Sequence, residues 1–399
     1  MNSKKSLFIK VLNYFVLLVI LLIVGLYITG NQYILKGIQL TYLKGRSTAG
    51  IYDYTDFTNR KIEKGNALPW QKHKNYNQIA ITDTLKNELL DFETEALVVI
   101  KDGKLWLEHY WNNRKPTAIS NSFSMSKSYV TMLMFKALEN GDIKSLNQPI
   151  IDFMPEFKGD KLAEKCTVGD FAAMTSGFDW KEDYYLPLNP TAKAYFADDI
   201  KEQMLSRKFI KEPGGHFEYL SGNTQLLAIL IERATGKNLS HLLSQHFWKP
   251  LGMENNGLWS LDGNGKMEKA YCCVNATALD YAKIGQLLLQ KGHWSGKQLI
   301  DSMHIEKMVK PNYKAFNAGE PAIYGYSIWT DYEHSPTFYA LLGHLGQRTI
   351  VIPEENLVIV RLGKKKDKRI LNKGILQKTG TDIYYLVDEI LKMNQENAE

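Results

Sequence analysis

The chain has 399 residues, of which 44% are hydrophobic and 23% are charged. These are ordinary values for a globular protein, and they exclude a disordered, collagen-like or coiled-coil chain. The net charge is +6, but removing Lys4, Lys5 and Lys10 from the 49 basic residues leaves 46 against 43 acidic ones. So small an excess does not indicate a nucleic-acid-binding protein, whose basic residues gather on one face.

The first element predicted along the chain is a membrane-spanning helix. No charged residue lies between Lys10 and Lys36, and the apolar stretch 11–30 is long enough as a helix to cross a hydrocarbon layer of about 30 Å. Because three lysines precede this stretch, the positive-inside rule predicts a cytoplasmic tail at 1–10 and sends the remaining chain to the extracytoplasmic side, periplasmic or extracellular.

A cleaved signal peptide is the competing interpretation of the same stretch. The first alanine of the chain is Ala49, so no A-x-A cleavage site is present, and the first cysteine is Cys166, which excludes a lipoprotein signal. We therefore favour an uncleaved signal anchor, both over a signal peptide and over a buried core helix.

The three cysteines do not form a disulfide framework, and their spacing matches no zinc site. Cys272 and Cys273 are adjacent in an apolar stretch, and we expect them to be small buried residues.

The remaining chain predicts two lobes. Residues 31–75 are expected to form a linker or N-terminal segment, and residues 76–396 the folded domain. The predicted elements are a hairpin over Glu95–Trp111 that turns at Asp102-Gly103, helices over Ser124–Asn140, Thr224–Ala234 and Thr381–Met393, and strands over Ile323–Thr330, Thr337–Leu342, Arg348–Ile352 and Leu357–Leu362. Strands at both ends with a mostly helical region between them indicate an α+β fold, in which one antiparallel sheet unites the two ends. The basic residues at 364–369 are expected in a solvated loop.

The candidate chemistry begins at Ser124-Met125-Ser126-Lys127, which is the one S-x-x-K in the chain. In a helix, Ser124 and Lys127 lie on the same face, and a helix N-terminus favours developing negative charge. A serine there, beside a buried lysine that can lose its proton, is an activated nucleophile. The alternative is an N-cap serine with an exposed lysine.

Two further motifs follow in order. The segment 213–221 (PGGHFEYLS) places Tyr219 and Ser221 on a loop that leads into a helix, and the segment 343–347 (GHLGQ) lies at the start of a strand. Each has a structural alternative, namely a core tyrosine with a capping serine, or a histidine at a strand edge.

With the three motifs in this order, the chain resembles the serine β-lactamase and penicillin-binding-protein superfamily. It is most similar to the class C-like branch of amidases and esterases that includes the 6-aminohexanoate-dimer hydrolases. The resemblance covers roughly residues 76–396, and further matches lie at 167–177 and 277–294. It implies the β-lactamase/transpeptidase-like α+β fold, with an antiparallel sheet flanked by helices plus a mostly helical lobe.

The resemblance also implies roles for individual residues. Ser124 would be the nucleophile, Lys127 its proton partner, and Tyr219 the general base for the serine and later the acid for the leaving group. Supporting positions are Ser221, where the family usually has asparagine, and His344 to Gly346, which replace K-[TS]-G. The oxyanion hole would be the backbone N–H groups of Ser124 and Gln347. A literal K-T-G at 378–380 is rejected, because the nineteen residues after it leave no room for two strands.

Departures from the family pattern bear on the substrate. A histidine in place of the K-T-G lysine weakens carboxylate binding, and no E-x-x-L-N run occurs. Penicillin hydrolysis is therefore not expected as the main activity. Tyr184 and Asn275 are candidate substrate contacts or packing residues, and Asp179 and Asp183 are candidates for binding a substrate amine.

The sequence thus predicts a membrane-anchored serine hydrolase, an amidase or carboxylesterase that works through a covalent acyl-enzyme. It would act on a small-molecule amide or ester without a metal or organic cofactor, and neither nucleic acid nor a protein partner is implied. The alternatives are a D,D-peptidase or β-lactamase acting on cell-wall-type substrates, and a non-catalytic penicillin-binding-like sensor.

Overall fold

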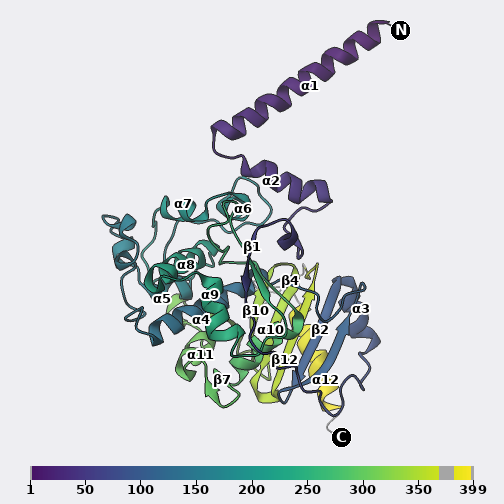
Figure 1. Cartoon of the computed structure of the whole chain (residues 1–399), viewed down its shortest axis with the longest axis vertical. Helices are drawn as coiled ribbons and strands as arrows, with labels where there is room; N and C mark the ends of the chain where they lie inside the picture. Colours follow the sequence, from purple (N-terminus) through teal and green to yellow (C-terminus); the bar gives the residue numbers. More distant parts are fainter. Residues whose placement is uncertain (1, 368–381, 397–399) are drawn as a thin grey trace.

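The computed structural model describes residues 2–367 and 382–396. Helix α1 (Asn2–Ile28) projects away from the domain, which begins beneath it with α2 (Tyr33–Leu40) (Figure 1). Among the described residues, α1 is the one helix that is long and apolar enough to cross a membrane, and none of that apolar stretch is buried against the protein. The literal K-T-G at 378–380 lies outside the described residues.

A six-stranded antiparallel sheet joins the two ends of the chain. Its strand order is β3-β2-β12-β11-β10-β9. The strands are β2 (Thr94–Lys101), β3 (Lys104–Tyr110), β9 (Trp329–Asp331), β10 (Phe338–Gly343), β11 (Gln347–Ile352) and β12 (Leu357–Gly363). β2 pairs with β12 across more than 250 residues of sequence, so the sheet closes only when both ends of the domain are in place.

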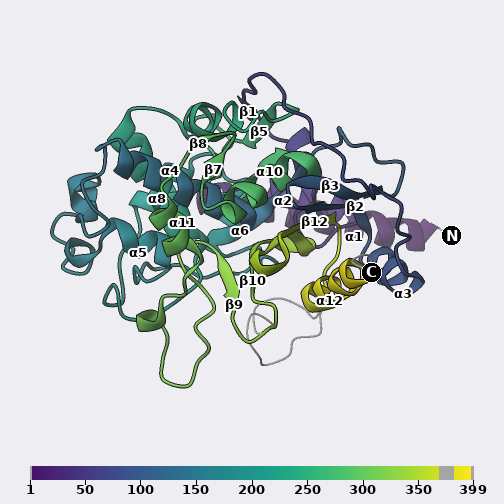
Figure 2. The same cartoon turned by 90° about the horizontal axis from the view of Figure 1, so that it is seen from below.

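Both faces of this sheet are buried. Side chains of successive strand residues point to opposite faces, so neighbouring residues of one strand pack into two different parts of the core. Leu97 and Val99 pack into the cluster that contains α12 (Asp382–Gln395). Val98 and Ile100 pack on the other face, in the main core with α10 (Ala278–Leu289). Figure 2 shows α3 (Asp83–Asp91) and α12 together on one side of the sheet and α10 on the other.

The second lobe is mostly helical and packs beside the sheet (Figure 1). Its helices are α4 (Ser126–Glu139), α5 (Val168–Ala173), α6 (Pro190–Phe196), α7 (Ile200–Leu205), α8 (Ser221–Thr235), α9 (Leu239–Leu243) and α11 (Ser302–Val309). The helix predicted over Ser124–Asn140 is confirmed as α4, and its residues 126–135 are buried on every face.

A smaller sheet fixes the chain just before α4. Its order is β1-β5-β6-β4, with β1 (Asn59–Ile62), β4 (Ser120–Asn121), β5 (Gly257–Ser260) and β6 (Val274–Ala276). A two-stranded hairpin, β7 (His293–Trp294) with β8 (Lys297–Gln298), lies apart from it in the strand pairing. Residues 31–75, expected as a linker, therefore supply α2 and β1 to the folded domain.

The predicted hairpin is confirmed, with Asp102 at φ +51° and Gly103 at φ +71° in its turn. The predicted strand over Ile323–Thr330 is wrong for most of its length, because only β9 (Trp329–Asp331) pairs with the sheet. Ser327 has φ +61°, and the N–H of Gly325 donates to the carbonyl of Ile328 at 3.0 Å, so this segment turns back on itself.

Arg361 on β12 holds the turn between β10 and β11. It is 3% exposed, and its Nη1 donates to the carbonyls of Leu345 (3.2 Å), Gly346 (2.9 Å) and Lys365 (2.8 Å). We expect Arg361→Met to lower the free energy of unfolding by about 3 kcal/mol, because the substitution leaves buried carbonyls unpaired. Urea unfolding of the full chain in detergent, followed by tryptophan fluorescence, measures it.

The matched control is Lys165→Met, which breaks an exposed ion pair with Glu212 and should cost less than about 1 kcal/mol. Equal losses in the two variants would show that Arg361 does not hold this turn.

Candidate active site

Ser124 is placed by a strained turn between β4 and α4. The N–H of Ser122 donates to the carbonyl of Val274 in β6 at 2.8 Å, and Asn121 Oδ1 accepts from the N–H of Phe123 at 2.8 Å. Phe123 has φ +45°, a left-handed conformation that costs a non-glycine residue about 1–3 kcal/mol. Ser124 follows directly, and it is partly exposed whereas every other residue from 120 to 135 is buried.

Lys127 lies one helical turn further along and is 1% exposed. Its ammonium group donates to Ser124 Oγ at 3.0 Å and to the carbonyl of Tyr271 at 2.9 Å. Burial lowers the pKa of Lys127 to about 8, and the charge of Glu182 opposes this decrease. A minority of the Lys127 side chains is therefore neutral at pH 7. The predicted pair comes together as a hydrogen-bonded unit.

Tyr219 lies just before α8 and faces the same point. Its ring centroid is 5.0 Å from Lys127 Nζ and 5.3 Å from the ring centroid of Trp329. Burial raises the pKa of the Tyr219 phenol well above its usual value, and Ser124, its hydrogen-bond partner, only partly offsets this increase. The phenol is therefore neutral at physiological pH, and it is a proton donor there.

Glu182 was not identified from the sequence, and it connects the other groups of the site. One oxygen accepts from the hydroxyls of Tyr184 and Ser221, both at 2.6 Å. The other accepts from the N–H of Ser221 at 2.7 Å and from Trp180 Nε1 at 3.0 Å. The hydroxyl of Tyr184 also has Ser124 as a hydrogen-bond partner. No motif surrounds Glu182, so only its position in space identifies it.

His344 and Gly346 form the short turn after β10. His344 Nε2 lies 3.1 Å from Thr48 Oγ1, and its ring centroid is 5.4 Å from that of Phe123. Burial, aided by the charge of Lys366, lowers the pKa of His344 to about 3, so the imidazole is uncharged at neutral pH. Gly346 has φ +83°, and a Cβ there would lie 2.3 Å from Arg361 Nη1.

Gln347 does not line the cavity that contains Ser124. Its backbone N–H donates to the carbonyl of His344, and its side chain donates to the carbonyl of Gly363 at 2.6 Å. The N–H that was expected to bind an oxyanion therefore has another partner in this structure.

The four candidate substrate contacts separate into two groups. Tyr184 and Asp183 line the same cavity as Ser124. The Asp183 carboxylate is occupied by the N–H groups of Tyr185 and Leu186, and these hydrogen bonds lower its pKa. Two candidates lie elsewhere.

Asp179 and Asn275 are the candidates outside the cavity. Asp179 is half exposed and forms an ion pair with Arg207 at 3.4 Å. Asn275 is fully buried in β6 and donates to the carbonyl of Cys273 at 2.8 Å, so it is a packing residue.

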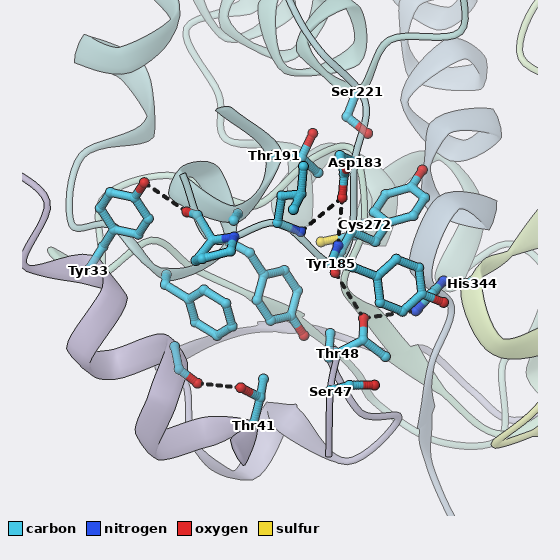
Figure 3. Close-up of a pocket in the computed structure, with 18 of the residues that line it drawn as sticks. Tyr33, Thr41, Ser47, Thr48, Asp183, Tyr185, Thr191, Ser221, Cys272 and His344 are labelled. Atoms are coloured by element: carbon cyan, nitrogen blue, oxygen red, sulfur yellow. Dashed lines mark hydrogen bonds between the residues drawn. The ribbon is translucent and has the colours of Figure 1, made fainter. Parts of the chain in front are cut away.

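The cavity has a volume of about 220 Å³ and is shown in Figure 3. Around the nucleophile it is lined by Ser124, Ser221, Tyr271, Cys272 and His344. Cys272 and Cys273 form a disulfide, which corrects the expectation that they are only small buried residues. The sheet, the helical lobe and the hydrogen-bonded Ser124–Lys127 pair define the serine β-lactamase and penicillin-binding-protein superfamily.

Comparison with known proteins identifies the family. The model of the Beta-lactamase family matches residues 87–373, so the chain belongs to this family. The 6-aminohexanoate-dimer hydrolase of Paenarthrobacter ureafaciens is 25% identical over 247 residues, which are 57% of this chain and 62% of that protein. A D-aminopeptidase of Brucella anthropi is 30% identical over 173 residues, which are 40% of this chain and 31% of that protein. The chain thus spans less than two thirds of these relatives.

Solved structures share the fold. A Bacillus anthracis protein provisionally named a 6-aminohexanoate-dimer hydrolase superposes with a TM-score of 0.73 at 24% identity, covering 87% of this chain and 94% of that one. A class C β-lactamase superposes with a TM-score of 0.59 at 15% identity, covering 80% and 98%.

The titration of Lys127 should be visible in the reactivity of Ser124. Below pH 7 Lys127 is protonated and cannot accept the serine proton, so we expect the rate of Ser124 modification by a fluorophosphonate to rise with pH through a midpoint near 8. Lys127→Met should remove this rise and slow the reaction at least about a hundredfold. Lys165→Met is the control. A rate that is independent of pH from 6 to 9 in the native chain would contradict this role of Lys127.

Glu182→Gln tests whether the Glu182 carboxylate influences the reaction through the pKa of Lys127 and through its hydrogen bonds to Ser221 and Tyr184. Because its charge raises the pKa of Lys127, the amide should move the midpoint of the same pH profile to lower pH, and loss of the hydrogen bonds to Ser221 and Tyr184 should slow modification about tenfold. An exposed carboxylate changed in the same way, Glu212→Gln, should have no effect. A slower rate with an unmoved midpoint would reduce Glu182 to a structural residue.

Proposed function

We propose that this chain is a serine hydrolase that cleaves an amide or ester bond through an acyl-enzyme at Ser124. The observation that carries the proposal is the 3.0 Å hydrogen bond between the buried Lys127 Nζ and the partly exposed Ser124 Oγ, just after the strained residue Phe123. A lysine whose pKa is about 8 can give up its proton at neutral pH and then accept the proton of the serine.

The proton transfers follow from the two pKa shifts. Neutral Lys127 takes the proton as Ser124 Oγ attacks the substrate carbonyl. Tyr219 then gives its proton to the leaving amine or alcohol and is reprotonated from Lys127. This revises the expectation that Tyr219 is the general base, because its raised pKa keeps the phenol protonated whereas Lys127 titrates near neutrality. Water, activated by the same groups, releases the acid.

The oxyanion needs two N–H donors, and we place them on the backbone of Ser124 and His344. Both residues line the cavity, whereas Gln347 does not, and the N–H of Gln347 donates within its own turn. A hydrogen-bond donor of this kind contributes about 3 kcal/mol to the transition state. The neutral His344 ring is held by Thr48, and its centroid lies 5.1 Å from that of the tilted Tyr184 ring; these contacts fix the turn that would supply this N–H.

A linear amide or ester suits the site better than a penicillin or a D,D-peptide. His344 carries no charge at neutral pH, so it offers no cation to a substrate carboxylate at the position where β-lactamases have a lysine. The relatives named 6-aminohexanoate-dimer hydrolase and D-aminopeptidase support an amide substrate.

We also propose that α1 anchors the enzyme in a membrane, with the catalytic domain on the extracytoplasmic side. The support is its length, its exposed apolar surface and the lysines Lys4, Lys5 and Lys10 at one end.

The nucleophile is tested by a fluorophosphonate probe on the full chain, with the adduct located by peptide mass spectrometry. We expect one adduct, on Ser124, and none in Ser124→Ala, which should also lose more than about 99.9% of its activity on p-nitrophenyl esters and the 6-aminohexanoate linear dimer. Nitrocefin and D-Ala-D-Ala peptides should be poor substrates.

The control is Ser206→Ala, a change of a serine that does not line the cavity. An adduct elsewhere, or undiminished turnover in Ser124→Ala, would overturn the proposal, and no reaction of the folded chain with any probe would favour the non-catalytic sensor.

A further inference from the structure

The cavity at Ser124 extends to α2, the helix that follows α1. One wall is α2, which supplies Tyr33, Ile34, Gly37 and Ile38, and the facing wall is the segment 183–187 with Phe196 of α6 (Figure 3). Most of the surface that these walls present to the cavity is apolar. The reacting serine therefore opens into a space that suits hydrocarbon rather than charge.

Helix α2 is fixed in this position by direct contacts. The hydroxyl of Tyr33 donates to the carbonyl of Pro187 at 3.0 Å, and the Tyr33 side chain is buried. A Cβ at Gly37 would lie 3.3 Å from the ring of Phe196, which shows how closely the two helices approach. The apolar wall is therefore part of the folded domain.

A second, larger groove of about 1140 Å³ adjoins the cavity and has the opposite character. Five cationic and five acidic side chains line it: Lys44, Arg46, Lys364, Lys365 and Lys366 with Asp53, Asp56, Asp91, Glu93 and Asp367. Ion pairs join several of them, such as Lys44 with Asp56 at 2.6 Å and Arg46 with Asp53 at 2.8 Å. A polar group of no net charge suits such a balanced surface best.

The cavity and the groove meet beside the nucleophile. Both are lined by Ser47, Thr48, Ala49, Tyr185 and His344. A substrate whose carbonyl reaches Ser124 can therefore place one end against apolar walls and the other in the polar groove. This arrangement matches an amphiphile whose scissile bond joins the two parts.

The chain also brings the cavity close to the end of α1. Four residues separate Ile28, the last residue of α1, from Tyr33, the first of α2, so the two Cα atoms are at most about 18 Å apart. Four of the apolar side chains that line the cavity are also exposed to solvent, namely Ile38, Tyr42, Tyr185 and Leu186. If α1 crosses a membrane, this side of the cavity lies at the membrane surface.

We propose that the substrate is an amphiphilic acyl compound of the membrane. Its acyl chain lies in the apolar cavity between α2 and residues 183–187, and its uncharged or zwitterionic polar part lies in the adjoining groove. Ser124 Oγ forms a bond to the acyl carbon, the bond from that carbon to the polar part breaks, and the polar part leaves with a proton. Water then attacks the acyl-enzyme and releases a carboxylic acid. The inference rests on the proposed serine hydrolase.

The test uses the full chain reconstituted into vesicles of a dialkyl ether phosphatidylcholine, which has no ester to cleave. The rates compared are those for p-nitrophenyl octanoate and p-nitrophenyl acetate. We expect kcat/KM to be at least about tenfold higher for octanoate, because the longer chain fills the apolar cavity. Ile34→Gln and Ile38→Gln should each lower the octanoate-to-acetate ratio at least about fivefold.

Leu43→Gln is the matched control, because Leu43 is an exposed apolar residue just after α2 that lines neither the cavity nor the groove. It should leave the ratio unchanged. Phosphonate labelling of Ser124 in each variant reports whether its site is folded. If the native chain labels normally but the ratio is near one or insensitive to both isoleucine variants, the acyl cavity is overturned while the hydrolase stands.

A separate experiment tests whether the substrate comes from the membrane. A phosphatidylcholine with a fluorogenic acyl ester, placed in the same vesicles, should be hydrolysed by the native chain and not by Ser124→Ala. Turnover of the dissolved octanoate ester with none of this lipid would overturn a membrane substrate. Failure of the folded chain to react with either ester or the phosphonate would instead count against the hydrolase itself.

Discussion

The site depends on keeping the cation of Lys127 almost completely out of water. A buried ammonium group is costly unless it is hydrogen-bonded, and here its partners are Ser124 Oγ and the carbonyl of Tyr271. Both partners are in position to accept these hydrogen bonds only when the small sheet is formed, because β4 leads to Ser124 and Tyr271 lies just before β6. The burial that makes this ammonium group unfavourable also makes its proton easier to remove, because desolvation lowers the pKa of Lys127 into the range in which it can act as a base.

The two lobes complete the arrangement from opposite sides. The helical lobe supplies Glu182, whose charge limits the decrease in the pKa of Lys127 and whose oxygens hold Ser221 and Tyr184. The six-stranded sheet supplies the turn at His344, which Arg361 holds from behind through the carbonyls of that turn. Ser221, Tyr184 and the turn at His344 are therefore each held by a second residue, and this is what a preorganised site requires.

The sequence predicted the parts that local pattern determines. The Asp102-Gly103 turn, the two ends of the main sheet and the spacing of Ser124 and Lys127 all follow from short-range rules, and the structure confirms these elements. The sequence did not identify Glu182, because a carboxylate in a loop acquires its role only from groups that are distant in sequence. The direction of the Gln347 N–H depended on a turn that no motif specifies. The segment 31–75 lacks a regular period, yet α2 folds because its apolar face packs on α6 and on the loop at Pro187.

In the proposed mechanism, Ser124 becomes acylated during turnover. The most direct measurement is acid quenching of the full chain during hydrolysis of p-nitrophenyl octanoate, followed by peptide mass spectrometry. We expect an octanoyl group on the peptide that contains Ser124, present in the steady state and absent from Ser124→Ala. An octanoyl group on a different residue, or rapid hydrolysis by Ser124→Ala with no acyl-enzyme at all, would contradict it.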